Sequence, residues 1–443
     1  MKTRRDFLNH ALGGVVVSAS IPSFIDPGSR GVADMTPGEK VKAENLLDKI
    51  SSVDVVDESY WDLVKEAFSL KPDLLLMHAA NLCPSPISVQ NQLWDLTLDV
   101  DQDASAQNRR KFSGLQEKSR TMLAGFLGAN SNEIAIVRNT SAANATVVNG
   151  LDLGPGDEVV LWDQNHPTNS ISWDVRAERY GFTVKRVGTP VNPKSPEDVI
   201  RPFQDALTSK TRLLSFSHVS NISGVKLPAK RLCALAHSNG SLAMVDGAQS
   251  FGCLDVDLHD IGCDFYTGSA HKWFLGPREA GVLYVRGSTV NNLWATHVGV
   301  GWENAVRNGA RKFEVLGQRD DAAVAAVATT VRFHETLGKQ RVEARVLELA
   351  SALKNGLGKR ISGTHFHTPL ETDMSGGVVV FLPPGSDARS LVTALYEQYG
   401  VAGAAMGGAF TGVRLCPHIY NTMAVSYTHL RAHETRHDIV CRL

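Results

Sequence analysis

The chain has few cysteines and no excess of charge of either sign. Its 443 residues include 6 cysteines, and no pair of them has the CxxC spacing of a zinc site or a redox dithiol. They are also too sparse for a disulfide scaffold, so we expect reduced and buried thiols. Lysine and arginine total 45 against 46 aspartates and glutamates. Proteins that bind nucleic acid show a basic excess or stripe, so nucleic acid is not expected as a partner.

Long hydrophobic runs are also missing. The N-terminus has Arg4 and Arg5 and then a weakly apolar run that is too short to span a bilayer. This order is typical of an export signal, and TRRDFL resembles the twin-arginine signal, whose pathway exports folded proteins. A basic amphipathic helix is the weaker alternative, because Gly13 and Gly14 disfavour a surface helix. We therefore predict a twin-arginine export signal over residues 1–32, a periplasmic or exported location, and no membrane association after its removal.

The composition is that of a globular protein, with 43% apolar and 21% charged residues. Apolar runs alternate with segments whose apolar residues recur at three and four positions, which predicts strands separated by helices. This alternation is typical of an α/β fold with a mostly parallel sheet, and ligands bind at the carboxyl ends of the strands in such sheets. The predicted strands are Glu133–Arg138, Asp157–Trp162, Phe182–Val187, Arg212–Val219, Leu242–Gly247 and Gly281–Arg286.

The pattern changes from about Asp320 onward. Two long helical stretches lead into a short strand, GGVVVFLP, and a further helix, DARSLVTALYEQYG. This order predicts a second, smaller α+β domain. We therefore assign residues 76–330 to a large domain and residues 331–425 to a small domain. Residues 33–75 are predicted to be a linker and an N-terminal segment that packs with the small domain.

Residues 426–443 are dense in histidine and arginine and lack an apolar stripe. They contain HETRH, from His433 to His437, which matches the H-E-x-x-H pattern of zinc hydrolases. The pattern lies six residues from the end of the sequence, which leaves no room for a third ligand or a substrate cleft. We interpret this tail as non-native sequence and predict no metal site.

Hydroxyl and imidazole side chains follow the first two predicted strands. Thr140 and Ser141 begin a helix, where backbone N–H groups and the helix dipole favour a phosphate. A plain helix cap is the more common reason for such residues. His166 lies in the loop before the next helix, where its ring could stack on a flat ligand or simply cap that helix.

Asp246 follows the apolar run Leu242–Val245. A carboxylate at the buried end of a strand must be paired or hydrogen-bonded to stay ionised. A protonated pyridine nitrogen and a cluster of backbone N–H groups are two partners that would achieve this. Asp246 taken by itself leaves both open.

Lys272 lies in the stretch TGSAHKWFLGP, between small residues and an aromatic pair. An amine in an apolar, partly cationic pocket has a lowered pKa and becomes nucleophilic, which is the precondition for a Schiff base. Ser269 and His271 flank Lys272 and could donate hydrogen bonds to a phosphate. We therefore expect Lys272 to be a reactive amine rather than an ordinary surface lysine.

These motifs, in this order, resemble the class V pyridoxal-phosphate enzymes of the aminotransferase superfamily. The resemblance runs from LLLMHAANLCPSPISV to VRLCPHIYNT, and Val315–Ala326 (VLGQRDDAAVAA) resembles the isopenicillin N epimerase-like branch. That branch usually reads G-T-R-D, so Gln318 replaces a threonine that would contact a phosphate across a dimer interface. The resemblance implies fold type I, with a mostly parallel sheet in a large domain and a smaller α+β domain, and a homodimer with the active site near its interface.

The resemblance also implies a role for each candidate residue. Lys272 forms the internal aldimine with pyridoxal 5'-phosphate and later moves the α-proton. Asp246 pairs with the pyridine nitrogen, His166 stacks on the ring, and Gln249 contacts the ring hydroxyl. The residues around the phosphate are Thr140, Ser141, Ser269 and His271.

The resemblance further implies that Arg414 binds a substrate carboxylate, a task that suits a planar guanidinium with two parallel donors. Asn221 would assist near the ring hydroxyl or that carboxylate. The resemblance thus implies an enzyme that acts at the α-carbon of an amino acid or derivative, as an epimerase or aminotransferase. A C–S or other β-lyase and an inactive cofactor-binding protein are the alternatives. Epimerisation, transamination and β-elimination share one carbanion, so these residues separate neither the reactions nor the substrates.

One departure from the family pattern concerns sulfur transfer. Relatives that transfer sulfur carry a nucleophilic cysteine on the loop before the arginine equivalent to Arg414. Here that loop reads VAGAAMGGAFTGVR and contains none, and Cys416 lies beyond the arginine in a strand pattern. A cysteine desulfurase is therefore disfavoured.

Overall fold

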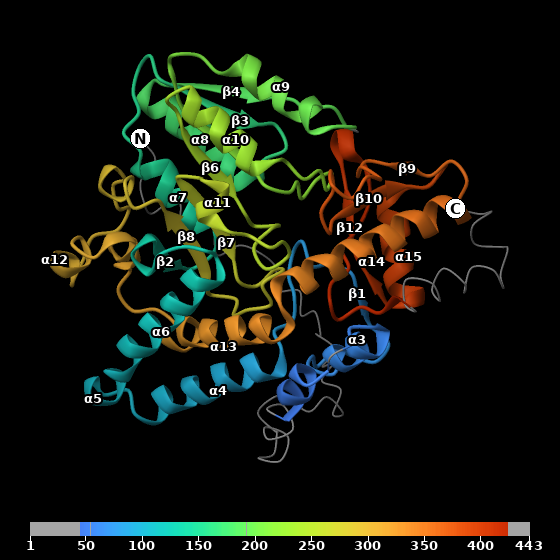
Figure 1. Cartoon of the computed structure of the whole chain (residues 1–443), viewed down its shortest axis with the longest axis horizontal. Coiled ribbons are helices and arrows are strands. Elements are labelled where there is room, and N and C mark those ends of the chain that lie inside the picture. The colour runs from blue at the N-terminus through green and yellow to red at the C-terminus, as the bar shows by residue number, and fades with distance from the viewer. Residues whose placement is uncertain (1–44, 54, 192, 424–443) are drawn as a thin grey trace, which may run out of the picture. The chain divides into compact units, whose positions relative to one another are not determined.

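Figure 1 shows a computed structural model of the chain, which describes residues 45–423 except residues 54 and 192. The predicted export signal, the HETRH pattern and Cys441 lie outside the described residues. The other five cysteines are free and buried, as expected. Within the described part of the chain, none of the helices combines the length and apolar character needed to cross a bilayer.

A seven-stranded sheet forms the centre of the fold. Its strands lie in the order β2-β8-β7-β6-β5-β3-β4. All neighbours pair in parallel except β8, which is antiparallel to both β2 and β7. The prediction of a mostly parallel α/β sheet is therefore confirmed. The strands are β2 (Ile134–Val137), β3 (Glu158–Trp162), β4 (Thr183–Val187), β5 (Thr211–Ser217), β6 (Leu242–Asp246), β7 (Phe265–Ser269) and β8 (Gly281–Val285).

Helices cover both faces of this sheet because successive residues of a buried strand point to opposite sides. In β3, Val159 and Leu161 join a hydrophobic cluster with residues of α7 and α8. Val160 and Trp162 join a second cluster with residues of α6, α9, α10 and α13. These helices are α6 (Lys111–Phe126), α7 (Thr140–Gly150), α8 (Pro167–Tyr180), α9 (Pro196–Ala206), α10 (Ala229–Ser238) and α13 (Asp321–Leu337).

A four-stranded antiparallel sheet follows in the sequence, in the order β12-β13-β10-β9. It shares a third cluster with α14 and α15, drawn in orange and red in Figure 1. The elements are α14 (Lys339–Arg360), β9 (His365–Phe366), β10 (Val379–Leu382), α15 (Ala388–Tyr399), β12 (Ala404–Met406) and β13 (Gly412–Leu415).

The N-terminal segment contacts this second group of elements. Strand β1 (Leu75–Leu76) pairs in parallel with β11 (Val401–Ala402). In α3 (Glu58–Lys65), the Glu58 carboxylate lies 2.7 Å from Arg345 on α14. The domain boundaries assigned from the sequence stay a prediction. The remaining elements are α4 (Ile87–Gln102), α5 (Ala106–Arg109), η2 (Ser131–Glu133), α11 (Leu258–Ile261), η3 (Val290–Asn292), α12 (Trp302–Ala305), η4 (Gly309–Glu314) and η5 (Gly408–Phe410).

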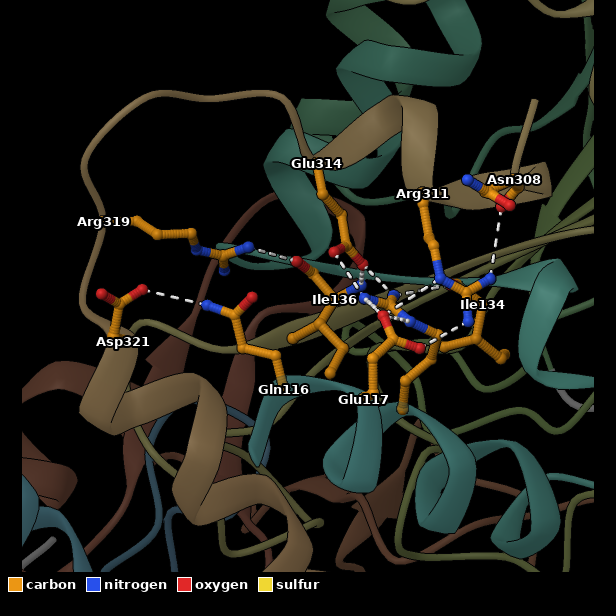
Figure 2. A network of polar contacts seen from close by, with 10 residues as sticks. Gln116, Glu117, Ile134, Ile136, Asn308, Arg311, Glu314, Arg319 and Asp321 are labelled. Atoms are coloured by element: carbon orange, nitrogen blue, oxygen red, sulfur yellow. Dashed lines mark hydrogen bonds and ion pairs between the residues drawn. The ribbon is translucent and has the colours of Figure 1, made fainter. Parts of the chain in front are cut away.

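Side chains complete the hydrogen bonding of β2, which is an edge strand (Figure 2). The Arg120 guanidinium donates to the carbonyl of Ile134 at 3.0 Å, and Arg319 donates to the carbonyl of Ile136 at 2.6 Å. Glu314 accepts from the Ile136 N–H and also pairs with Arg120, with Nη2 and Oε2 2.8 Å apart. An edge strand otherwise presents unpaired backbone groups. These contacts fix the strand that leads into the first turn of α7.

Candidate active site

Six strands of the central sheet run in the same direction, so the segments that follow them meet at one edge. Thr140 follows β2, His166 follows β3, and Asn221 follows β5. Asp246 is the last residue of β6, and Lys272 lies three residues after β7. The sheet therefore places most of the predicted site residues along its carboxyl edge.

Lys272 has a mostly buried side chain. Burial lowers the pKa of its amine, the positive charge of Arg414 lowers it further, and Asp246 and Cys83 oppose this change. Among the residues that the structure describes, none donates to or accepts a hydrogen bond from its Nζ. A larger neutral fraction of the amine at a given pH makes Lys272 a better nucleophile and base.

Asp246 is 2% exposed and both of its carboxylate oxygens accept hydrogen bonds. Oδ2 accepts from Asn144 Nδ2 at 3.1 Å, and Oδ1 accepts from the Ala248 N–H at 3.0 Å. Thr267 in turn donates to Asn144 Oδ1 at 2.8 Å. Sequence reasoning missed Asn144, although its spacing of four from Thr140 places both on one face of α7 and was a usable signal.

Thr140 and Ser269 meet at the N-terminus of α7. Their hydroxyl oxygens lie 2.7 Å apart, and the Thr140 N–H donates to Ser269 Oγ at 2.8 Å. Asn139 caps the helix by accepting from the Ala142 N–H. Ser141 is exposed and lies outside this contact. The two hydroxyls and the positive end of the helix dipole make this corner suitable for an anionic group.

His166 caps α8, because its Nδ1 accepts from the Thr168 N–H at 3.3 Å. Burial lowers the pKa of the imidazole, and the charges of Lys272 and Arg414 lower it further, while Asp246 raises it. His166 therefore caps the helix and also lies near the charged residues of the site. The charges of Lys272, Asp246 and Arg414 thus lie close enough to His166 to affect its pKa.

Arg414 enters the site from β13 and is 8% exposed. Its Nη1 donates to the backbone carbonyl of Asn221 at 2.9 Å. Its buried Nε has no partner among the described residues. Asn221 therefore reaches Arg414 through its main chain. A buried guanidinium with a free donor is the kind of group that a carboxylate ligand completes.

Gln249 and His271 lie beside Lys272 with contacts of their own. The Gln249 side chain donates to the Ala80 carbonyl at 3.0 Å and accepts from Trp273 Nε1 at 2.7 Å. One of its amide hydrogens is left for a ligand. His271 Nδ1 lies 3.3 Å from the Arg278 carbonyl, and burial lowers the pKa of its ring.

The segment before α4 also lies near Lys272. Sequence reasoning assigned none of its residues to the site. The Cys83 N–H donates to the His271 carbonyl at 2.8 Å, and burial raises the pKa of the Cys83 thiol to about 12. His78 forms a parallel bridge with Cys416, and burial and the charge of Arg414 lower its pKa. Both residues lie within LLLMHAANLCPSPISV, the first stretch on which the resemblance rests.

Comparisons with known proteins show the family and the fold of this chain. The family model for class V aminotransferases matches residues 97–428. Isopenicillin N epimerase of Streptomyces clavuligerus is 30% identical over 78% of this chain and 90% of its own, and that of Amycolatopsis lactamdurans is 32% identical over 77% and 89%. The structure of a C-DES lysine-to-alanine mutant, with glycine covalently linked to its pyridoxal-phosphate cofactor, superimposes with a TM-score of 0.76. It is 22% identical, over 83% of this chain and 98% of that one.

Proposed function

Since this chain belongs to the class V aminotransferase family, we propose that it removes and returns the α-proton of an amino acid or amino-acid derivative. It is a pyridoxal-phosphate-dependent enzyme, and the observation that carries the proposal is the grouping of Lys272 and Asp246, at the edge of the central sheet, with Arg414 on β13, whose charge acts on the Lys272 amine. The amine is uncharged more often than a free lysine, which suits proton removal at neutral pH. The guanidinium suits recognition of a carboxylate on the same substrate.

The residues present fit pyridoxal phosphate. The hydroxyl pair of Thr140 and Ser269 at the N-terminus of α7 would hold a phosphate, and the buried Asp246 would hold a protonated ring nitrogen. The Lys272 amine makes no hydrogen bond with the described residues and is free for the aldehyde. When bound, this cofactor withdraws electrons from the substrate α-carbon. The chain's own residues then orient the substrate and hold or move the proton at Lys272 Nζ.

Epimerisation or racemisation is the reaction that we place first. Two relatives named isopenicillin N epimerase are matched over about nine tenths of their own length. The Cys83 thiol beside Lys272 has a pKa of about 12, so it stays protonated and does not supply a thiolate for sulfur transfer. β-Elimination begins with the same proton removal and needs no thiolate. It is therefore the second candidate.

The decisive experiment is α-proton exchange in deuterated water. Purified protein with added pyridoxal phosphate is incubated with a panel of L- and D-amino acids and small peptides, and NMR follows loss of the α-proton. We expect exchange for at least one compound, with the enantiomer as the product, and no exchange with K272A. An oxo acid or an elimination fragment would establish another reaction of the same site. No exchange with any compound would support an inactive cofactor-binding protein.

Cofactor attachment has a separate test. Wild-type protein should be yellow, and borohydride should fix the cofactor on the peptide that contains Lys272, as mass spectrometry would show. A colourless protein that takes up no added cofactor would contradict the proposal. K272A should bind the cofactor without being modified by borohydride.

We also propose that the enzyme is a homodimer and is exported. Large apolar side chains are exposed, among them Trp94 and Leu98 on α4, each 43% exposed, and Trp294, 73% exposed. Such groups together favour burial against another subunit. Light scattering should give twice the mass of the chain, and W94E should lower the measured mass.

The export proposal has its own test. Fusion of residues 1–32 to a reporter should give export that depends on Arg4 and Arg5.

A further inference from the structure

The turn that follows Lys272 has an unusual backbone. Leu275 has φ of 60°, and it is the one non-glycine residue with positive φ in the described part of the chain. The Leu275 N–H donates to the Lys272 carbonyl at 2.9 Å, and the Gly276 N–H donates to the Ala270 carbonyl at 2.7 Å. A leucine rarely adopts this left-handed conformation. Such strain persists only where the surroundings hold it.

One group that holds this turn is His418, which is fully buried. Its Nδ1 accepts from the Ile419 N–H at 2.8 Å, so the ring proton is on Nε2. Nε2 lies 2.8 Å from the Trp273 carbonyl and therefore donates to it. The Trp273 side chain is held as well, by Gln249 at 2.7 Å. The residue after Lys272 is thus fixed through both its main chain and its side chain.

The second group is His334 on α13, which is 1% exposed. Its Nε2 lies 2.9 Å from the Phe274 carbonyl, which can only accept. Its ring also stacks on that of Phe274, with an angle of 4° and centroids 5.0 Å apart. Burial lowers the pKa of His334 to about 4 and that of His418 to about 3, so both rings are neutral donors at pH 7.

We propose that His334 and His418 are positioning residues for Lys272. Their donations to two successive carbonyls hold the strained turn and so fix the direction from which the Lys272 side chain enters the site. The two rings come from α13 and from the segment after β13, which lie 84 residues apart. This inference rests on the proposed role of Lys272 and names two groups that act on it without touching the substrate.

Paired substitutions separate the hydrogen bond from the packing. H418Q can keep a donor near Trp273, whereas H418N keeps an acceptor for Ile419 and loses the donor. H334Q can keep a donor near Phe274, whereas H334F keeps the stacked ring and loses the donor. We expect H418N and H334F to lower kcat by about 10- to 100-fold, because small misplacement of a catalytic group has effects of this size. KM should change by less than about threefold, and both glutamine variants should retain most of the wild-type kcat.

A control variant accounts for general destabilisation. Val331 is fully buried on α13, one turn before His334, and V331A leaves a core cavity without touching the turn. It should lower the melting temperature but not kcat. If H334F and H418N keep the wild-type kcat, or if V331A lowers kcat as much as they do, the inference is wrong.

A measurement on cofactor-free protein tests the inference apart from the enzyme reaction. Amide hydrogen exchange in the peptide that contains Leu275 and Gly276 should be at least about tenfold faster in H418N than in wild type or V331A. Unchanged exchange would overturn the inference even if the enzyme is active. Absence of α-proton exchange in wild type would instead contradict the proposed function.

Discussion

Arg414 is the residue on which substrate affinity should depend most. Its Nη1 is held by the Asn221 carbonyl at 2.9 Å, and its buried Nε lacks a partner in the described structure. We predict that R414A raises KM for an amino-acid substrate about 10- to 100-fold, because hydrogen bonds to charged groups contribute about 1.5–3 kcal/mol. Cofactor absorbance should not change, since Lys272 and Asp246 remain. Steady-state kinetics and visible spectra measure both.

A matched control for this substitution is R212A. Arg212 pairs with Asp157 at 2.7 Å on an exposed part of the surface, and it should leave KM within the error of wild type. R414K keeps the charge but loses the planar fork, so its KM should lie between those of wild type and R414A. An unchanged KM for R414A would remove Arg414 from the substrate site.

Single residues were predictable where their immediate neighbours carried the signal. Lys272 was found because small and aromatic residues flank it, and Asp246 because it ends an apolar run. His334 and His418 were not found, because each acts through a carbonyl more than 50 residues away in the sequence. A histidine within an apolar helix face gives no local sign of which carbonyl it will meet. His334 and His418 could therefore be identified only from the tertiary structure.

The edge strand β2 depends on Glu314 for part of its hydrogen bonding. The side chain of Arg120 is 2% exposed and that of Glu314 is 14% exposed. We predict that E314A lowers the free energy of unfolding by about 3–5 kcal/mol, because it leaves a buried charge unpaired. It also leaves the Ile136 N–H without its acceptor. Urea unfolding followed by circular dichroism measures the loss.

The control for E314A is E117A, because Glu117 is a second partner of Arg120 that is 45% exposed. An ion pair at that exposure contributes about 0–1 kcal/mol, so E117A should have a small effect. Equal losses in E117A and E314A would show that burial of the pair does not determine its contribution to stability.

The segment after β5 is held by Thr368. The Thr368 hydroxyl donates to the Ser223 carbonyl at 2.6 Å and accepts from the Val380 N–H at 2.8 Å. Asn221, two residues before Ser223, provides the carbonyl that holds Arg414. We predict that T368V raises KM about 2- to 10-fold, the equivalent of one hydrogen bond, and that T368S restores it. Equal KM values in T368V and wild type would show that this hydroxyl does not position Arg414.

At the level of elements, the hydrophobic pattern predicted most of the central sheet. It missed β7, because only the first two residues of Phe265–Ser269 are apolar while the last three are small and polar. It also could not give the direction of β8, since a fully buried strand reads the same in either direction. Both limits concern the strands that precede and follow Lys272 in the sequence.

Three distant parts of the chain contact the main chain on either side of Lys272. Cys83 donates its N–H to the His271 carbonyl. His418 donates to the Trp273 carbonyl, and His334 donates to the Phe274 carbonyl. Burial of these groups follows from the whole fold rather than from one element. For the same reason, the protonation of the buried histidines is linked to global unfolding.

Acid should therefore destabilise the protein through its buried imidazoles. A histidine in the unfolded chain titrates near pH 6.5, whereas burial lowers the pKa of His218 and His334 to about 4 and that of His418 to about 3. Because the unfolded state binds protons first, their contribution to stability is complete above about pH 6.5 and is lost as the pH falls toward 4. Each imidazole contributes a slope of about 1.4 kcal/mol per pH unit in this range.

Urea unfolding at intervals between pH 7 and pH 4.5 tests this prediction. The free energy of unfolding should fall with a slope approaching about 4 kcal/mol per pH unit for the three groups together. H418Q should remove about one third of that slope, because glutamine does not titrate. H297Q, which replaces an exposed histidine, should leave the slope unchanged. A wild-type stability that stays constant from pH 7 to pH 5 would mean that these rings take up protons without unfolding, and their carbonyl contacts would then persist in the charged form.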